Sequence, residues 1–312
     1  GVNPFVVDTF NNRMQAMYQF GSFLYQWNTG GGPFLQPHAA AIDGNFIYVA
    51  DTGNHRIQKF GWTQVEECHN CNPQADPCCE ALPTVGGPWT SILVGTHNRN
   101  TFPVVPYAVT IYDLTSSPVP AEDNDWASMS RYYGPGNSWT ADSLGSVFGL
   151  TLDEYGNIFV THTSCYSGDE IGQVFNAGPG AVYRIDGATG AITTFVKLPN
   201  FPDGSVFPPE DLPGLGNITY DCNHKQFFVT NHEDGKIYRI QAVGVNGPTG
   251  TVVQTFDPLA PDNGLSGWAP SGERLWGVQW HRDRIYYAVW AVDMSEGTGP
   301  NEIRSVGLLP NG

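Results

Sequence analysis

Short runs of β-branched and aromatic residues alternate with turns rich in Gly, Asn and Asp along most of the chain. Such runs predict β-strands, because their side chains suit a pleated, half-buried surface, and Gly, Asn and Asp favour tight turns. The runs fall into groups of three or four, as expected for a series of small antiparallel sheets. The predicted strands are 38–42, 46–50 and 56–60, then 147–152, 158–161, 181–185 and 192–196, then 217–220, 226–230, 236–240 and 251–256, and finally 275–280, 284–289 and 302–306.

One polar pattern, an Asp followed by an Asn and an Arg at fixed spacing, occurs twice, 43 residues apart. Each copy joins two predicted strands. Asp and Asn side chains bind their own backbone in tight turns, and the donors of an Arg can bind the Asp carboxylate. The pattern therefore predicts a structural turn that recurs in successive units of a repeat protein. The six residues are Asp8, Asn11, Arg13, Asp51, Asn54 and Arg56.

The stretch Pro37–Phe60, PHAAAIDGNFIYVADTGNHRIQKF, resembles a complete NHL repeat. Proteins with this repeat are β-propellers, usually with six blades, in which four-stranded antiparallel blades surround a central tunnel. The resemblance therefore implies an all-β propeller, with six blades expected and five as the alternative. Most relatives bind partners, whereas a few are metal-dependent lyases or lactonases, so the resemblance implies a fold more firmly than a function.

The chain is expected to form one propeller domain over residues 1–312. Residues 4–27 would supply three strands of a first blade without its inner strand. Residues 275–312 would supply a last blade whose outer strand is missing or shared, because ring closure usually divides one blade between the two ends. Residues 303–306 could be the inner strand of the first blade or the third strand of the last, and their likeness to residues 182–185 and 237–240 favours the third strand. The chain would then be part of a longer surface protein or filament.

Two segments interrupt the regular pattern. Residues 61–88 contain a cluster of cysteines and are expected to be an insertion that leads to the outer strand of the second blade, at 89–94. Residues 96–144 contain one convincing strand, 106–112, and are otherwise rich in Pro, Ser and Trp. They form either an irregular third blade or a long surface excursion.

Charge limits the classes of partner. The chain has 14 Lys and Arg against 30 Asp and Glu, a net charge of −16. Nucleic-acid binding depends on Lys and Arg that neutralise phosphates, so we expect no nucleic-acid partner. We also expect no membrane insertion, because no apolar run approaches the roughly 18 residues needed to span a bilayer. An acidic, Lys-poor surface is typical of secreted proteins, and we expect an extracellular or cell-surface location.

The six cysteines are unevenly spaced. Four crowd into one short segment, where adjacent cysteines fit a zinc site poorly; disulfides are the favoured interpretation, with zinc and free thiols as alternatives. Cys165 and Cys222 stand alone. They should lie on opposite faces of a propeller, roughly 15 Å apart by strand rise, so we predict that they are not bonded to one another. The disulfide candidates are Cys68, Cys71, Cys78 and Cys79.

Acidic residues concentrate in the loops that follow the second strand of each expected blade. These loops share one face of a propeller, so that face should carry a negative potential suited to a cation or a basic partner. The alternative is a set of solvated turns that keep the protein soluble. The acidic binding candidates are Asp169, Glu170, Glu233 and Asp234.

Aromatic residues cluster in and beside the irregular segment. Exposed rings in long loops can anchor a protein partner or stack on sugars. Alternatively, these rings cover the side of an irregular third blade. The aromatic binding candidates are Trp126, Tyr132, Tyr133 and Trp139.

The start of each inner strand should face the tunnel, which places His38, Asn217 and Trp276 there, with Phe148 at the same level. Calcium-dependent lactonases and arylesterases on six-bladed propellers hold their metal at such positions. Asn217 lies in a stretch similar to one of their ligand strands, which makes calcium a candidate cofactor. Calcium requires six to eight oxygens, so no cofactor is firmly expected.

These observations favour a non-enzymatic recognition or assembly module that binds a protein or a glycan through its acidic loop face. The competing hypothesis is a calcium-dependent lactonase or esterase with a metal in the tunnel. A third is a purely structural repeat in a filament or adhesin.

Overall fold

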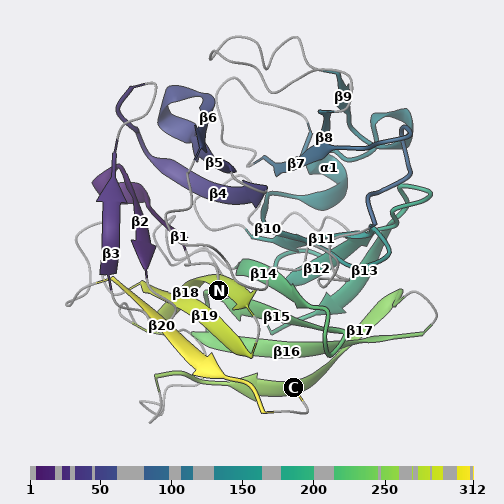
Figure 1. Ribbon diagram of the computed structural model, residues 1–312. Coiled ribbons are helices and arrows are strands. Elements are labelled where there is room, and N and C mark those ends of the chain that lie inside the picture. The colour runs from purple at the N-terminus through teal and green to yellow at the C-terminus, as the bar shows by residue number, and fades with distance from the viewer. Residues whose placement is uncertain are drawn as a thin grey trace. The chain divides into compact units, whose positions relative to one another are not determined.

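The protein, in a computed structural model, is made of antiparallel β-sheets with few and short helices (Figure 1). In the described part of the chain there are six sheets of three or four strands. None of the described helices is long and apolar enough to cross a membrane. The structure describes residues 5–17, 23–28, 32–43, 46–61, 81–97, 107–114, 130–163, 177–199, 214–244, 247–259, 269, 273–281, 283–290, 301–309 and 312.

The chain divides into two compact units. Unit 1 comprises Gly1–Asp76 and Ser117–Met129, and unit 2 comprises Pro77–Ser116 and Ser130–Gly312. Unit 1 contains two three-stranded sheets. Their strands are β1 (Phe5–Asp8), β2 (Arg13–Met17) and β3 (Phe23–Trp27), and β4 (Pro37–Asp43), β5 (Phe46–Asp51) and β6 (Arg56–Gly61).

Two sheets of unit 2 have four strands in sequential order, as predicted from the spacing of their apolar runs. Every neighbouring pair is antiparallel. The first is β10 (Val147–Leu152), β11 (Ile158–His162), β12 (Ala181–Ile185) and β13 (Ile192–Lys197). The second is β14 (Leu215–Asp221), β15 (Gln226–Asn231), β16 (Lys236–Val243) and β17 (Thr249–Phe256).

A third sheet of unit 2 is β18 (Arg274–His281), β19 (Arg284–Trp290) and β20 (Glu302–Gly307). Ile303 pairs with Ala288 and Val306 with Ile285, so residues 303–306 form the third strand of this sheet, as expected.

The remaining sheet of unit 2 corrects one prediction. It consists of β7 (Ile92–Thr96), β8 (Val109–Asp113) and β9 (Arg131–Tyr132). Residues 89–94 were expected to close the second blade, but β7 instead pairs along its whole length with β8. The apolar run carried no information about its partner, because the connection on either side is long and the strand lacks a turn that would fix its register.

The core of unit 2 lies between successive sheets. Phe159 of β11, Phe195 of β13 and Phe227 of β15 pack together with ring centroids 4.4 to 5.1 Å apart, which joins the two four-stranded sheets. A further buried cluster joins the β14–β17 sheet to the β18–β20 sheet. As a result, the first strands β10, β14 and β18 lie next to one another in that order (Figure 1).

Candidate functional site

The first strand of each of the last three sheets carries a bulge at the same place. Pairing with the second strand is interrupted in β10, β14 and β18 between the first and last residues of a four-residue segment that begins and ends with an aliphatic residue. A bulge re-aims the side chains at its centre. The residues inside the three bulges are Phe148 and Gly149, Gly216 and Asn217, and Trp276 and Gly277.

Two buried threonines hold these bulges in place. Thr161 Oγ1 accepts the N–H of Gly149 at 2.8 Å and donates to the carbonyl of Gly216 at 2.7 Å. Thr230 Oγ1 accepts the N–H of Asn217 at 3.0 Å and donates to the carbonyl of Trp276 at 2.7 Å. Each hydroxyl therefore satisfies its own sheet's bulge and binds the first strand of the next sheet.

Aromatic rings meet at this level of the strands. The rings of Phe148 and Trp276 lie 4.4 Å apart at 47°, and the ring of His232 meets Trp276 edge-on at 4.9 Å. Phe148, Asn217 and Trp276 are half-buried, whereas His232 is fully buried. We call Phe148, Asn217, Trp276 and His232 the ring cluster.

The amide of Asn217 is oriented by its own strand, because Oδ1 accepts the N–H of Ile218 at 2.8 Å. Among the described residues, no group of three His, Cys, Asp or Glu side chains lies close enough to hold a metal ion. The calcium role of Asn217 stays a prediction. His38, the third tunnel candidate, lies on β4 of unit 1 and is exposed, although partial desolvation lowers its pKa.

His162, at the end of β11, is fully buried. A Cβ atom on Gly145 would lie 2.2 Å from His162 Nε2, so the ring packs directly on the backbone after helix α1 (Ala141–Leu144). Gly145 has φ of 71°, which a residue with a side chain would rarely adopt. The tight packing fits a core histidine.

The predicted acidic face is only partly tested by the described residues. Glu233 is fully buried, so it cannot form part of an exposed acidic surface. Burial raises the pKa of Asp234, against the opposing effect of a hydrogen bond from the Tyr238 hydroxyl. These two acids lie in the turn after β15, where Glu233 is buried and Asp234 is half-buried; a loop assignment from sequence could not show this. Asp169 and Glu170 lie outside the described residues.

The aromatic candidates also divide. Trp139 is fully buried, and its indole N–H donates to the carbonyl of Gly190 at 2.9 Å, so it belongs to the core and not to an exposed loop. Tyr132 meets the edge of Trp139, and Tyr133 stacks on Tyr107 at 3.8 Å. Trp139 therefore has the covering role, whereas Tyr132 and Tyr133 are half-buried and their binding role stays a prediction. Trp126 lies outside the described residues.

The repeated polar turns of unit 1 share one set of contacts. The Asp51 carboxylate accepts bonds from Asn54, Arg56 and Gln58 at 2.9, 2.7 and 2.8 Å. Burial opposes ionisation of Asp51, but the hydrogen bonds outweigh it and lower the pKa of this carboxyl. The pattern therefore forms the structural turn expected of it, held by hydrogen bonds to one carboxylate; we call such a turn a clasp. In the first copy the donors are Asn11, Arg13 and Gln15, and the acceptor is Asp8.

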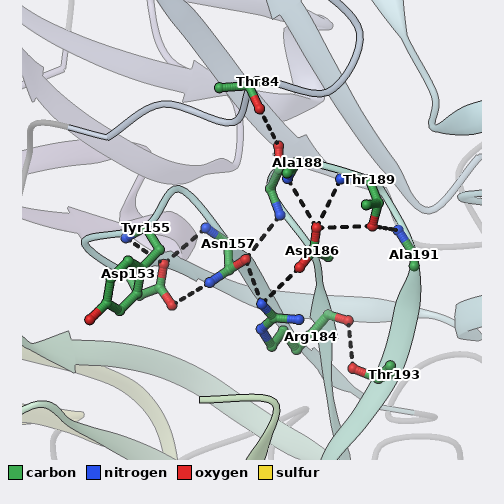
Figure 2. Close-up of polar contacts among 11 residues, drawn as sticks. Thr84, Asp153, Tyr155, Asn157, Arg184, Asp186, Ala188, Thr189, Ala191 and Thr193 are labelled. Carbon is green, nitrogen blue, oxygen red and sulfur yellow. Dashed lines mark hydrogen bonds and ion pairs between the residues drawn. The ribbon is translucent and has the colours of Figure 1, made fainter. Parts of the chain in front are cut away.

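Figure 2 shows a denser network at the turns of the β10–β13 sheet. Asp153 accepts the N–H groups of Tyr155 and Asn157 at 2.9 Å and the Asn157 amide at 2.7 Å. Asn157 Oδ1 in turn accepts Arg184 at 2.8 Å and the N–H of Gly187 at 2.9 Å. Burial is the main cause that raises the pKa of Asp153.

The same network continues to Asp186, which binds Arg184 at 2.9 Å and accepts the N–H groups of Ala188 and Thr189 at 3.1 and 2.8 Å (Figure 2). The N–H of Thr84 donates to the Gly187 carbonyl at 2.7 Å and so fixes the preceding segment to this turn. The polar groups of this network bind one another and the backbone of their own turns. It is a structural clasp, so the ring cluster remains the candidate site.

The cysteines give one firm observation: Cys222, just after β14, is disulfide-bonded. The other five cysteines lie outside the described residues. Thr163 pairs with Gly214, before the start of β14, and β14 then runs roughly 25 Å to Cys222 at about 3.3 Å per residue. Two residues of chain span at most about 7 Å, and a disulfide needs its Cα atoms within about 7 Å of each other. Because Cys165 lies outside the described residues, the absence of a bond between Cys165 and Cys222 stays a prediction.

Comparison with known proteins identifies one segment. Residues 34–60 match the family model of the NHL repeat. The chain contains an NHL repeat. The match covers β4 to β6 with their clasp, which is where the sequence resemblance was strongest.

Solved structures show the fold more widely. Luciferin-regenerating enzyme is 12% identical, with 97% of this chain and 87% of that chain covered and a TM-score of 0.50. A functionally unknown protein from Desulfotomaculum acetoxidans DSM 771 is 10% identical over 98% and 92%, at 0.49. Streptogramin B lyase is 13% identical over 99% and 67%, at 0.30. No curated protein matches the sequence. At 12% identity, the likeness to luciferin-regenerating enzyme concerns the fold alone.

Proposed function

We propose that this protein is a non-enzymatic recognition module, located outside the cell or at its surface, that binds a protein or glycan partner. The observation that carries the proposal is the ring cluster, in which three neighbouring first strands place half-buried rings and an amide at one level. Strand-borne rings are rigid, so little side-chain entropy is lost when a partner covers them. A stacking surface beside an amide is the chemistry that recognises sugars and apolar side chains.

The architecture proposed with this function is a six-bladed propeller around a central tunnel. Six described sheets of three or four antiparallel strands support it, as does the side-by-side order of β10, β14 and β18. Six blades around a tunnel in an experimental map would bear it out, whereas five would contradict it.

The extracellular location is supported by two features. Disulfides persist mainly in oxidising compartments, and Cys222 is disulfide-bonded. The net charge of −16 also suits a soluble surface protein and opposes anionic partners. We therefore expect a neutral or basic partner.

The test is titration calorimetry with panels of neutral oligosaccharides and, separately, of uncharged and basic peptides. One panel should contain a ligand, and Trp276→Ala and Phe148→Ala should each weaken its binding at least tenfold, because each removes a large part of the ring surface. The matched control is Tyr155→Ala, which removes a ring that is 56% exposed at a turn far along the sheet.

Two results would overturn the proposal. Binding that both ring variants leave unchanged would place the site elsewhere. Turnover of lactones or esters that depends on added calcium and is lost in Asn217→Ala would establish the competing hydrolase.

A further inference from the structure

β20 differs from the third strands of the two neighbouring sheets. β12 is followed by β13 and β16 by β17, but in the part of the chain that the structure describes β20 ends its sheet. Ile303 of β20 is 44% exposed. Val182 and Ile237, which occupy the same register in β12 and β16, are 0% and 3% exposed. Ile303 is therefore open to solvent at a register where its two counterparts are covered.

An outermost strand presents a row of backbone N–H and C=O groups to whatever lies beside it. An added strand satisfies these groups, and the alternating side chains decide which strand fits. β20 is short and carries one acid and one base, Glu302 and Arg304, whose side chains are 41% and 43% exposed and lie 2.8 Å apart. These two charges lie on one face, with Ile303 between them on the other.

This arrangement is complementary to itself. In an antiparallel pair of two β20 strands with Ile303 opposite Ile303, Glu302 of each copy faces Arg304 of the other. Opposite charges across an antiparallel pair are stabilising, and like charges are destabilising. The two exposed Ile303 side chains would also cover one another. The geometry points to a second copy of this chain as the partner, joined through β20 into one continuous six-stranded sheet.

The contact should be weak when it acts alone. A single strand pair buries well below the roughly 1,000 Å² expected of a stable interface, so the dimer should form only at high concentration or where many copies are held together. Each copy carries a net charge of −16, and this long-range repulsion should be screened at physiological salt, where the Debye length is about 8 Å.

The experiment is sedimentation velocity of the full chain in 150 mM salt over a wide concentration range, with charge-exchange variants. Wild type should dimerise as concentration rises. Glu302→Arg and Arg304→Glu should each remain monomeric, because each places like charges opposite one another. The double variant Glu302→Arg with Arg304→Glu should dimerise again, because both copies carry the exchanged pair.

The matched control is Thr193→Arg, a charge added to an exposed position on β13, the outermost strand of another sheet; it should leave the dimer intact. A monomer at every concentration would overturn the inference, as would single variants that dimerise like wild type or a double variant that does not recover. The ring cluster is not involved, so Trp276→Ala should dimerise normally, and the two proposals can fail separately.

Discussion

Thr161 offers the sharpest test of how the sheets of unit 2 are joined. Its side chain is fully buried, and its hydroxyl serves two backbone groups, the N–H of Gly149 and the C=O of Gly216. Thr161→Val keeps the volume and branching of the side chain but removes both bonds. Both backbone groups belong to buried glycines, so water cannot replace the hydroxyl without opening the packing between β10 and β14.

The expected cost follows from those two orphaned groups. Leaving a buried donor or acceptor unpaired costs about 1–3 kcal/mol, and some of this is recovered by local relaxation and by the more apolar side chain. We therefore expect Thr161→Val to lower the free energy of unfolding by about 3 kcal/mol. The matched control is Thr194→Val on β13, whose side chain is exposed; it should change the free energy by no more than about 0.5 kcal/mol.

Urea unfolding followed by tryptophan fluorescence measures the free energy, and hydrogen exchange reports the local effect. The amide of Gly149 should exchange much faster in Thr161→Val than in wild type, while amides in β16 should change only as much as global stability does. If Thr161→Val unfolds within about 0.5 kcal/mol of wild type and Gly149 stays protected, the hydroxyl does not hold the bulge and the reasoning is wrong.

Three further outcomes are expected. The pKa of Asp51 is lowered, so its ionised form stabilises the fold above pH 3.8, the usual pKa, and this contribution is lost as pH falls through the lowered pKa. The stability advantage of wild type over Asp51→Asn in urea unfolding should therefore shrink between pH 7 and pH 3. A constant difference would refute this. Tyr220→Phe removes a hydrogen bond to the Glu154 carboxylate that links two sheets, and should cost about 2 kcal/mol; thermal unfolding unchanged from wild type would contradict this. Peptide mapping of the unreduced protein should find Cys222 linked, and a link to Cys165 would disprove the strand geometry.

The strands themselves were predictable because their residues report local geometry. In the two four-stranded sheets the predicted and observed bounds agree within a few residues, since turns such as Asp153–Asn157 mark each reversal with side chains that bind their own backbone. The third strand of the last sheet was predicted for the same reason, from its likeness to β12 and β16.

Pairing and burial were not predictable in the same way. The apolar run at β7 was recognised as a strand, but its partner depends on which chain segment returns beside it. Trp139 and Glu233 were placed in exposed loops on composition, and both are fully buried. Burial is set by segments distant in sequence, so neither aromatic content nor charge at a loop position reveals it.

The ring cluster could be predicted only in part. Asn217 and Trp276 were assigned to one level because each begins a first strand, yet the bulges that aim them were not visible in the sequence. A usable signal does exist in the sequence. In each of the three bulges a Gly stands next to the residue that joins the ring cluster, and in two of the three second strands a Thr, Thr161 or Thr230, lies opposite the bulge.

That glycine explains why the site and the stability of unit 2 depend on the same few positions. A Cβ atom on Gly149 would lie 2.7 Å from Asn217 Cα, and one on Gly216 would lie 2.3 Å from the Trp276 carbonyl oxygen. The first strands can approach this closely only because a side chain is missing there. The same approach lets the threonine hydroxyls reach the next strand and brings the rings of Phe148 and Trp276 together. Substitution of the half-buried ring residues should therefore cost little stability although it weakens binding, whereas substitution of the glycines and threonines behind them should destabilise the fold.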